Sequence, residues 1–158
     1  AAASARLSGT ALYSGFYLNE LLLRLLQRHD AHPELFDVYA ATLPNLQTDP
    51  QRPLRLFEKH LLETLGYGLL LDHEAGGEPV TADADYVYAL EAGPSRSSEA
   101  TVGQLRVSGR SLLSLAAEDL SDAQSLTDSK RLLRAALDLY LGSRGLKTRE
   151  VFAALTAR

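Results

Sequence analysis

The spacing of hydrophobic residues predicts helices over most of the chain. Apolar side chains recur every three to four positions in six separate stretches, as they do on the buried face of an amphipathic helix. Short connections between the first three stretches favour antiparallel packing of neighbouring helices. We therefore expect a mainly α fold, a single compact domain of about six helices, at about 10–28, 33–43, 53–65, 109–118, 125–141 and 148–156.

The helical period is lost between the third and fourth predicted helices, over about 69–107. The first part of this segment is rich in Gly, Asp and Pro, which is typical of a loop. Tyr86 and Tyr88 then alternate with smaller residues and indicate a short strand, and a second strand is predicted near 104–107. Residues 91–100 are expected to form a flexible loop tip. The sequence thus predicts a short, irregular β-containing insertion in the helical domain.

Residues suited to helix ends stand at the predicted boundaries. Small polar side chains cap helix starts, proline fits the first turn, and glycine fits the position just after the last turn. A polar linker after Pro44 is predicted to separate the second and third helices. The candidate end residues are Asp30 or His32 before the second helix, Pro53 and Gly66 at the two ends of the third, Ser108 before the fourth, Gly142 after the fifth and Thr148 at the start of the sixth.

The third predicted helix combines an apolar stripe with positive charge. Leu54, Phe57 and Leu61 are spaced three and four residues apart and share one face. Arg55 and Lys59 lie four residues apart beside this stripe, and an arginine can bind a carboxylate through two hydrogen bonds. One interpretation is an edge that binds an acidic, apolar-ended peptide. The other is that the apolar residues are core and Arg55 is a surface charge.

Composition points to one ordinary globular domain. With 158 residues, of which 46% are hydrophobic and 23% charged, the chain can bury a core without metal or disulfides. The absence of cysteine excludes thiol nucleophiles and cysteine zinc sites and fits a reducing compartment. No apolar run is long enough for a membrane span, and no signal peptide is recognisable. We expect a soluble cytoplasmic protein, and, because the initiating methionine is missing, a fragment or a processed chain.

Charge is distributed unevenly along the chain. The net charge is −4, but residues 130–158 carry seven basic and two acidic side chains, so 1–129 is strongly acidic. The basic part is either a solvated helix face or a surface for DNA phosphates. The only nearby aromatic residues, Tyr140 and Phe152, fit the core pattern, which limits the prediction to contacts with the DNA backbone. The candidate DNA-binding residues are Lys130, Arg131, Arg134, Arg144, Lys147 and Arg149.

Signals for catalysis or metal binding are weak. The chain has no G-x-S-x-G nucleophile motif and no Walker loop. His29 and His32 are three residues apart, but they flank a predicted helix boundary and are expected to have capping or surface roles. We therefore expect no enzyme activity, cofactor or metal. The rival interpretation, a small hydrolase, would place its site in the Gly-rich insertion, at His73, Glu74 and Asp83 or Asp85.

Four blocks of sequence resemble a known family. They read LYSGFYLNELLLRLL, HPELFDVYAATLPNL, LRLFEKHLLETLGYG and YLGSRGLKTREVF, and they occur in the order of the C-terminal helical region of RecO-family bacterial recombination mediators. The resemblance covers about 12–68 and 126–152. Some family members carry a four-cysteine zinc module in the middle region, so this chain resembles the metal-free branch. Members also begin with a DNA-binding OB fold, for which this chain has no matching segment.

The resemblance implies a non-enzymatic role in the RecF pathway of DNA repair. Family members anneal complementary strands and, with the partner RecR, help to load RecA onto DNA coated by single-stranded DNA-binding protein. The acidic, apolar-ended C-terminal tail of that coating protein recruits them to the bacterial nucleoid. An alternative is a purely structural domain that stabilises an OB fold. The matching tail site would comprise Leu54, Arg55, Phe57, Lys59 and Leu61, with Leu56 where relatives can have a second arginine.

Overall fold

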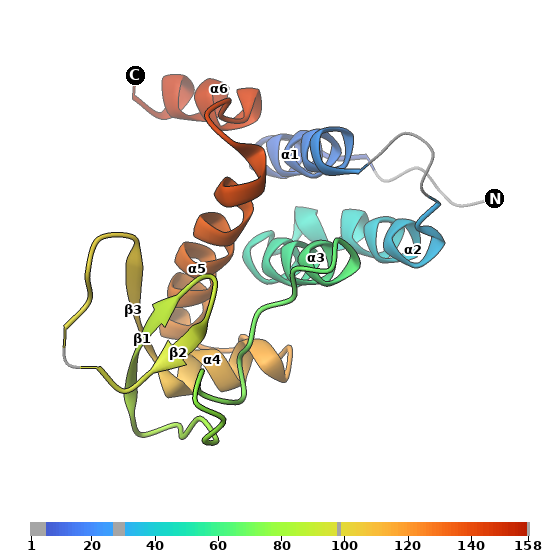
Figure 1. Ribbon diagram of the computed structural model, residues 1–158. Helices are drawn as coiled ribbons and strands as arrows, with labels where there is room; N and C mark the ends of the chain where they lie inside the picture. Colours follow the sequence, from blue (N-terminus) through green and yellow to red (C-terminus); the bar gives the residue numbers. More distant parts are fainter. Residues whose placement is uncertain (1–5, 27–30, 98, 158) are drawn as a thin grey trace.

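The computed structural model describes residues 6–26, 31–97 and 99–157, and it is mainly helical (Figure 1). The described residues form six α-helices, one short 3-10 helix, η1, and a small sheet inserted between α3 and α4. The mainly α prediction with a β-containing insertion is therefore confirmed. The elements are α1 (Thr10–Leu25), α2 (Pro33–Thr42), η1 (Leu43–Gln47), α3 (Gln51–Thr64), β1 (Asp85–Ala89), β2 (Gly93–Ser95), β3 (Gln104–Ser108), α4 (Gly109–Ala116), α5 (Ala123–Leu141) and α6 (Lys147–Thr156).

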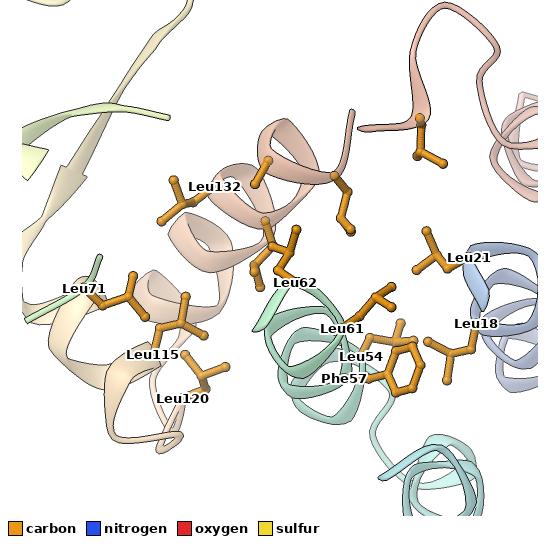
Figure 2. Close-up of a cluster of buried hydrophobic side chains, with 14 of the residues drawn as sticks. Leu18, Leu21, Leu54, Phe57, Leu61, Leu62, Leu71, Leu115, Leu120 and Leu132 are labelled. Carbon is orange, nitrogen blue, oxygen red and sulfur yellow. The ribbon is translucent and has the colours of Figure 1, made fainter. Parts of the chain in front are cut away.

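The long helix α5 connects the two ends of the fold. It packs against α3 and α4, and the sheet lies beside α4 and the first half of α5 (Figure 1). At the other end, α1 packs against η1, α5 and α6. Figure 2 shows the apolar core between these elements, where Phe57 and Leu61 of α3 point toward Leu18 and Leu21 of α1. Burial of such a stripe is the main force that assembles the helices.

The insertion is an antiparallel sheet in the order β2-β1-β3. Tyr86 pairs with Val107 of β3, and Tyr88 pairs with Pro94 of β2. Both tyrosines are buried, and so is Val87 between them, so β1 is covered on both faces. The segment 91–100 was expected to be a loop tip, but it contains β2. Gly93 has a φ of 110°, which permits the turn out of β1 and brings its backbone against the Leu70 side chain.

Local signals marked three helix ends correctly. Gly66 is left-handed at the end of α3, where its N–H donates to the Glu63 carbonyl and that of Tyr67 to the Leu62 carbonyl, a Schellman motif. The Ser108 hydroxyl accepts from the Ser111 N–H at the start of α4. Gly142, with a φ of 69°, ends α5. In each case the signal lies within a few residues of the helix end that it determines.

The start of the third helix and the linker before it differ from the prediction. The third helix begins at Gln51 rather than Pro53, because Pro50 already has helical backbone angles and Asp49 accepts from the Gln51 N–H. The predicted linker after Pro44 is partly η1, which Leu46 anchors in the core. His32 stands before α2 without a side-chain capping bond, and Asp30 and His29 lie outside the described residues. Among the described helices, none has the length and apolar character needed to cross a bilayer.

Candidate functional site

A cleft of about 490 Å³ opens where α1, α3, α5 and α6 meet. Figure 1 shows α1 and α6 side by side at one end of α5, with α3 on the other side of α1. The cleft combines basic, aromatic and small polar side chains. Its lining includes Tyr13 and Tyr17 of α1, Leu54, Arg55 and Glu58 of α3, Lys130 and Arg134 of α5, and Thr148, Arg149 and Phe152 of α6.

A buried ion pair forms one wall of the cleft. Arg55 is 5% exposed and Glu58 is 1% exposed, and Arg55 Nε lies 2.5 Å from Glu58 Oε1. Neither of these two atoms makes a hydrogen bond of normal geometry, and Arg55 Nη1 has no hydrogen-bond partner among the described residues. Unsatisfied buried polar groups are costly and uncommon. The ion pair therefore leaves a donor of the guanidinium unsatisfied in the wall of the cleft.

Tyr17 holds the acidic member of this pair. Its hydroxyl donates to Glu58 Oε2 at 2.7 Å. Burial raises the pKa of Tyr17 above its ordinary value, and the neighbouring Glu58 carboxylate raises it further. Tyr17 therefore stays protonated as a donor at neutral pH. The bond fixes Oε2 and leaves Oε1 beside the Arg55 guanidinium.

Three further cations surround the cleft. Lys130 and Arg134 are exposed and lie one turn apart on α5. Arg149 of α6 donates to Asp138 Oδ1 at 2.7 Å and lies over the ring of Tyr17. Burial works against the charge of Arg149, but the bonds to Asp138 and Tyr17 raise its pKa above the ordinary value, so it remains charged. The cleft therefore attracts anions.

Apolar side chains adjoin the cations. Tyr13 and Phe152 meet edge to face, with ring centroids 5.9 Å apart, and Phe152 remains 41% exposed. Leu54 contributes apolar surface from α3, although it is only 8% exposed. Cations beside an aromatic pair suit a ligand that carries both negative charge and an apolar group.

Helix α6 is attached through a carboxylate on α1. Glu20 accepts from the Lys147 N–H at 2.8 Å, and from the N–H and hydroxyl of Thr148 at 3.0 and 2.8 Å. Partial burial opposes the charge on Glu20, yet these bonds together lower its pKa. Thr148 was predicted as a local cap, but Leu146 occupies the N-cap position and the capping oxygens come from Glu20. The only sequence signal for this role was an acidic residue in the otherwise apolar centre of α1.

The predicted tail-binding residues divide between cleft and core. Leu54 and Arg55 line the cleft. Phe57 and Leu61 are 0% exposed, because the stripe that they share is covered by neighbouring helices, so they do not form the expected surface edge. Lys59 lies away from the cleft and pairs with Glu63 at 2.8 Å. For Phe57 and Leu61 the structure matches the alternative interpretation as core.

The six predicted DNA-binding cations do not form one surface. Lys130, Arg134 and Arg149 line the cleft. Arg131 projects from another side of α5, where it donates to the Arg106 carbonyl and approaches Asp128. Arg144 and Lys147 are exposed near the turn into α6.

The two aromatic residues assigned to the core are partly exposed instead. Tyr140 is 39% exposed and stacks on Tyr67, with ring centroids 4.0 Å apart. Phe152 lines the cleft. Tyr140 and Phe152 fit the apolar stripes of their helices, but neighbouring elements do not cover these two positions fully. Spacing alone does not show which positions of a stripe are covered.

The residues of the rival hydrolase do not converge on a site. His73 is exposed and pairs with its neighbour Asp72, and Glu74 faces Arg96 at 3.6 Å. Asp83 and Asp85 are exposed. Over the described ranges, no group of three or more His, Asp or Glu side chains is arranged to hold a metal ion.

Comparisons with known proteins identify one family. Residues 6–150 match the family model described as recombination protein O C terminal. The chain is 53% identical over 152 residues to DNA repair protein RecO of Alkalilimnicola ehrlichii, which covers 94% of this chain and 60% of that protein. It is 49% identical to the Nitrosococcus oceani protein of the same name, with 90% and 59% covered, and 43% identical to that of Dechloromonas aromatica, with 94% and 64% covered.

The relatives named here are bacterial DNA repair proteins, which is the class of protein that the matches indicate. Because the family model covers nearly the whole chain, the chain belongs to the RecO family and corresponds to its C-terminal region. It spans about three-fifths of the length of these relatives.

Proposed function

We propose that this chain is the partner-binding part of a non-enzymatic recombination mediator. Its cleft would bind the acidic, apolar-ended C-terminal tail of single-stranded DNA-binding protein. The observation that carries this proposal is the buried Arg55 guanidinium, whose Nη1 has no partner within the described structure although it borders an open cleft. A carboxylate at this position would satisfy it with a charge-assisted hydrogen bond.

The remaining walls fit the other features of such a tail. Lys130 and Arg134 would pair with acidic side chains, and Tyr13 and Phe152 would contact its apolar end. This revises the predicted site, since Phe57, Lys59 and Leu61 would support α3 rather than contact the tail. No covalent chemistry is required, because binding alone would place the mediator on coated DNA.

The wider role would follow the RecF pathway of recombinational repair at the bacterial nucleoid. We propose strand annealing and, with RecR, loading of RecA as activities of the complete protein. Single- and double-stranded DNA would contact exposed cations outside the cleft. Arg131, Arg144 and Lys147 fit this role because their contacts would leave the tail site open.

The test is a fluorescence-anisotropy titration of a labelled tail peptide against the chain and two matched variants. Arg134→Ala removes a charge from the cleft, and Arg131→Ala removes the same charge from another side of α5. We expect Arg134→Ala to weaken binding roughly five- to ten-fold, with a shallower salt dependence, and Arg131→Ala to have little effect.

Equal losses in the two variants would place the tail elsewhere on α5. Absence of binding to a chain that circular dichroism shows to be folded would favour the purely structural role. A peptide with an amidated C-terminus serves as the ligand control, because it lacks the terminal carboxylate proposed to reach Arg55.

A further inference from the structure

The cleft contains one acidic side chain among its four cations. Glu58 is the only Asp or Glu among the described residues that line it, beside Arg55, Lys130, Arg134 and Arg149. It is 1% exposed, and its Oε1 accepts no hydrogen bond within the described structure. Glu58 neutralises the buried Arg55, and its negative charge also opposes a polyanion that enters the cleft.

We infer that Glu58 is a specificity-determining residue that makes the cleft select a peptide over a nucleic-acid backbone. The inference rests on the proposed function of the cleft. Among the described residues, Arg55 Nη1 makes no hydrogen bond, and Glu58 Oε1 accepts none although it lies 2.5 Å from Arg55 Nε; both side chains line the cleft. Together they match a peptide, which offers both N–H donors and carboxylate or carbonyl acceptors.

A phosphodiester backbone could bind the Arg55 donor but not the Glu58 acceptor. It carries one negative charge per nucleotide and has no hydrogen-bond donor on its phosphates, so it would accept from Arg55 but be repelled by Glu58. The bond from Tyr17 to Oε2, at 2.7 Å, keeps the carboxylate from turning away. Glu58 would thus keep DNA out of the tail site and leave DNA to the exposed cations elsewhere.

The test compares Glu58→Gln with Glu34→Gln in the whole chain. Each substitution removes one negative charge, but Glu34 is an exposed residue of α2 that does not line the cleft. Two labelled probes are titrated by anisotropy at fixed salt: an acidic peptide with a free C-terminus and a short single-stranded oligonucleotide.

Glu58→Gln is expected to tighten oligonucleotide binding roughly ten-fold or more, since like-charge repulsion is removed, and to change peptide affinity much less. The unlabelled peptide should then displace the oligonucleotide, and adding Arg134→Ala should cancel the gain. Glu34→Gln should change neither affinity. Unchanged oligonucleotide affinity in a folded Glu58→Gln chain would overturn the inference.

Different results would contradict tail binding by the cleft and the selective role of Glu58. If the wild-type chain binds no peptide, the tail-binding function fails, while the oligonucleotide result still decides the role of Glu58. If Glu58→Gln does not fold, Arg55→Met with Glu58→Met replaces the pair by apolar side chains, a change that buried ion pairs often tolerate. That variant should lose the peptide and retain oligonucleotide binding. Retained peptide binding would contradict a role of the pair in selection.

Discussion

Gly109, the first residue of α4, lies against the segment that leads into β1. A Cβ at this position would lie 1.8 Å from the Thr81 carbonyl oxygen and 2.9 Å from the ring of Tyr86. Its N–H donates to the Ala84 carbonyl at 2.8 Å, so the backbone cannot move away without losing that bond. The first residue of α4 is therefore confined to glycine.

Gly109→Ala is expected to lower the free energy of unfolding by about 2–3 kcal/mol, because the clash is with backbone rather than with a flexible side chain. Urea denaturation followed by circular dichroism measures this. Gly76→Ala is the matched control, since nothing lies within 4 Å of its Cβ position, and its effect should stay within about 0.5 kcal/mol. Similar losses in both variants would show that the clash relaxes at low cost.

At the scale of elements, α6 depends on one side chain from another helix. None of its residues is buried, and its first turn is capped by Glu20 of α1. Arg24 lies on α1, as Glu20 does. It donates to the carbonyls of Leu141, Arg144 and Gly145 and so fixes the turn between α5 and α6. The wall that α6 contributes to the cleft is therefore held mainly by polar contacts.

Glu20→Gln should loosen α6 and lower stability by about 1 kcal/mol, as loss of an N-cap does. Hydrogen exchange of the 147–156 amides should accelerate far more than that of α5. Because the folded-state pKa of Glu20 is lowered, its contribution is present above the unfolded-state pKa and is lost as pH falls through the folded-state pKa. The exchange difference between wild type and variant should therefore disappear in acid.

Glu34→Gln is the control for this substitution, because Glu34 is an exposed acid in the first turn of α2 with no role at α6. Unchanged exchange of the 147–156 amides in Glu20→Gln would mean that the remaining contacts suffice to hold α6.

Sequence reasoning predicted the elements but only part of the site. The Gly66 and Ser108 end signals are local, so they can be recognised without knowledge of the fold. The face of α3 is different, because spacing shows that Phe57 and Leu61 share a side but not whether other helices cover it. Contacts between residues far apart in sequence, such as Tyr17 with Glu58 and Glu20 with Thr148, leave no periodic signal. The cleft is built from such contacts.

At the scale of the whole molecule, one apolar core joins the cleft end to the insertion. The cluster runs from Leu18 and Leu21 of α1, through α3, to Leu115 of α4 (Figure 2). It also includes the buried Tyr86 and Tyr88 of β1. Helix α5 contributes to it along its length, including Leu132 and Leu141. The mainly polar attachment of α6 leaves that helix outside this cooperative unit.

We therefore expect a single cooperative unfolding transition for everything except α6. The chain has no tryptophan, so tyrosine fluorescence reports on both Tyr17 beside the cleft and the buried Tyr86 and Tyr88 of the insertion. The urea midpoint measured by tyrosine fluorescence should coincide with the midpoint measured by circular dichroism of the helices. Gly109→Ala should shift both midpoints equally, although Gly109 lies far from the cleft. Two separated midpoints would show instead that the insertion unfolds on its own, and Gly109→Ala would then move only one of them.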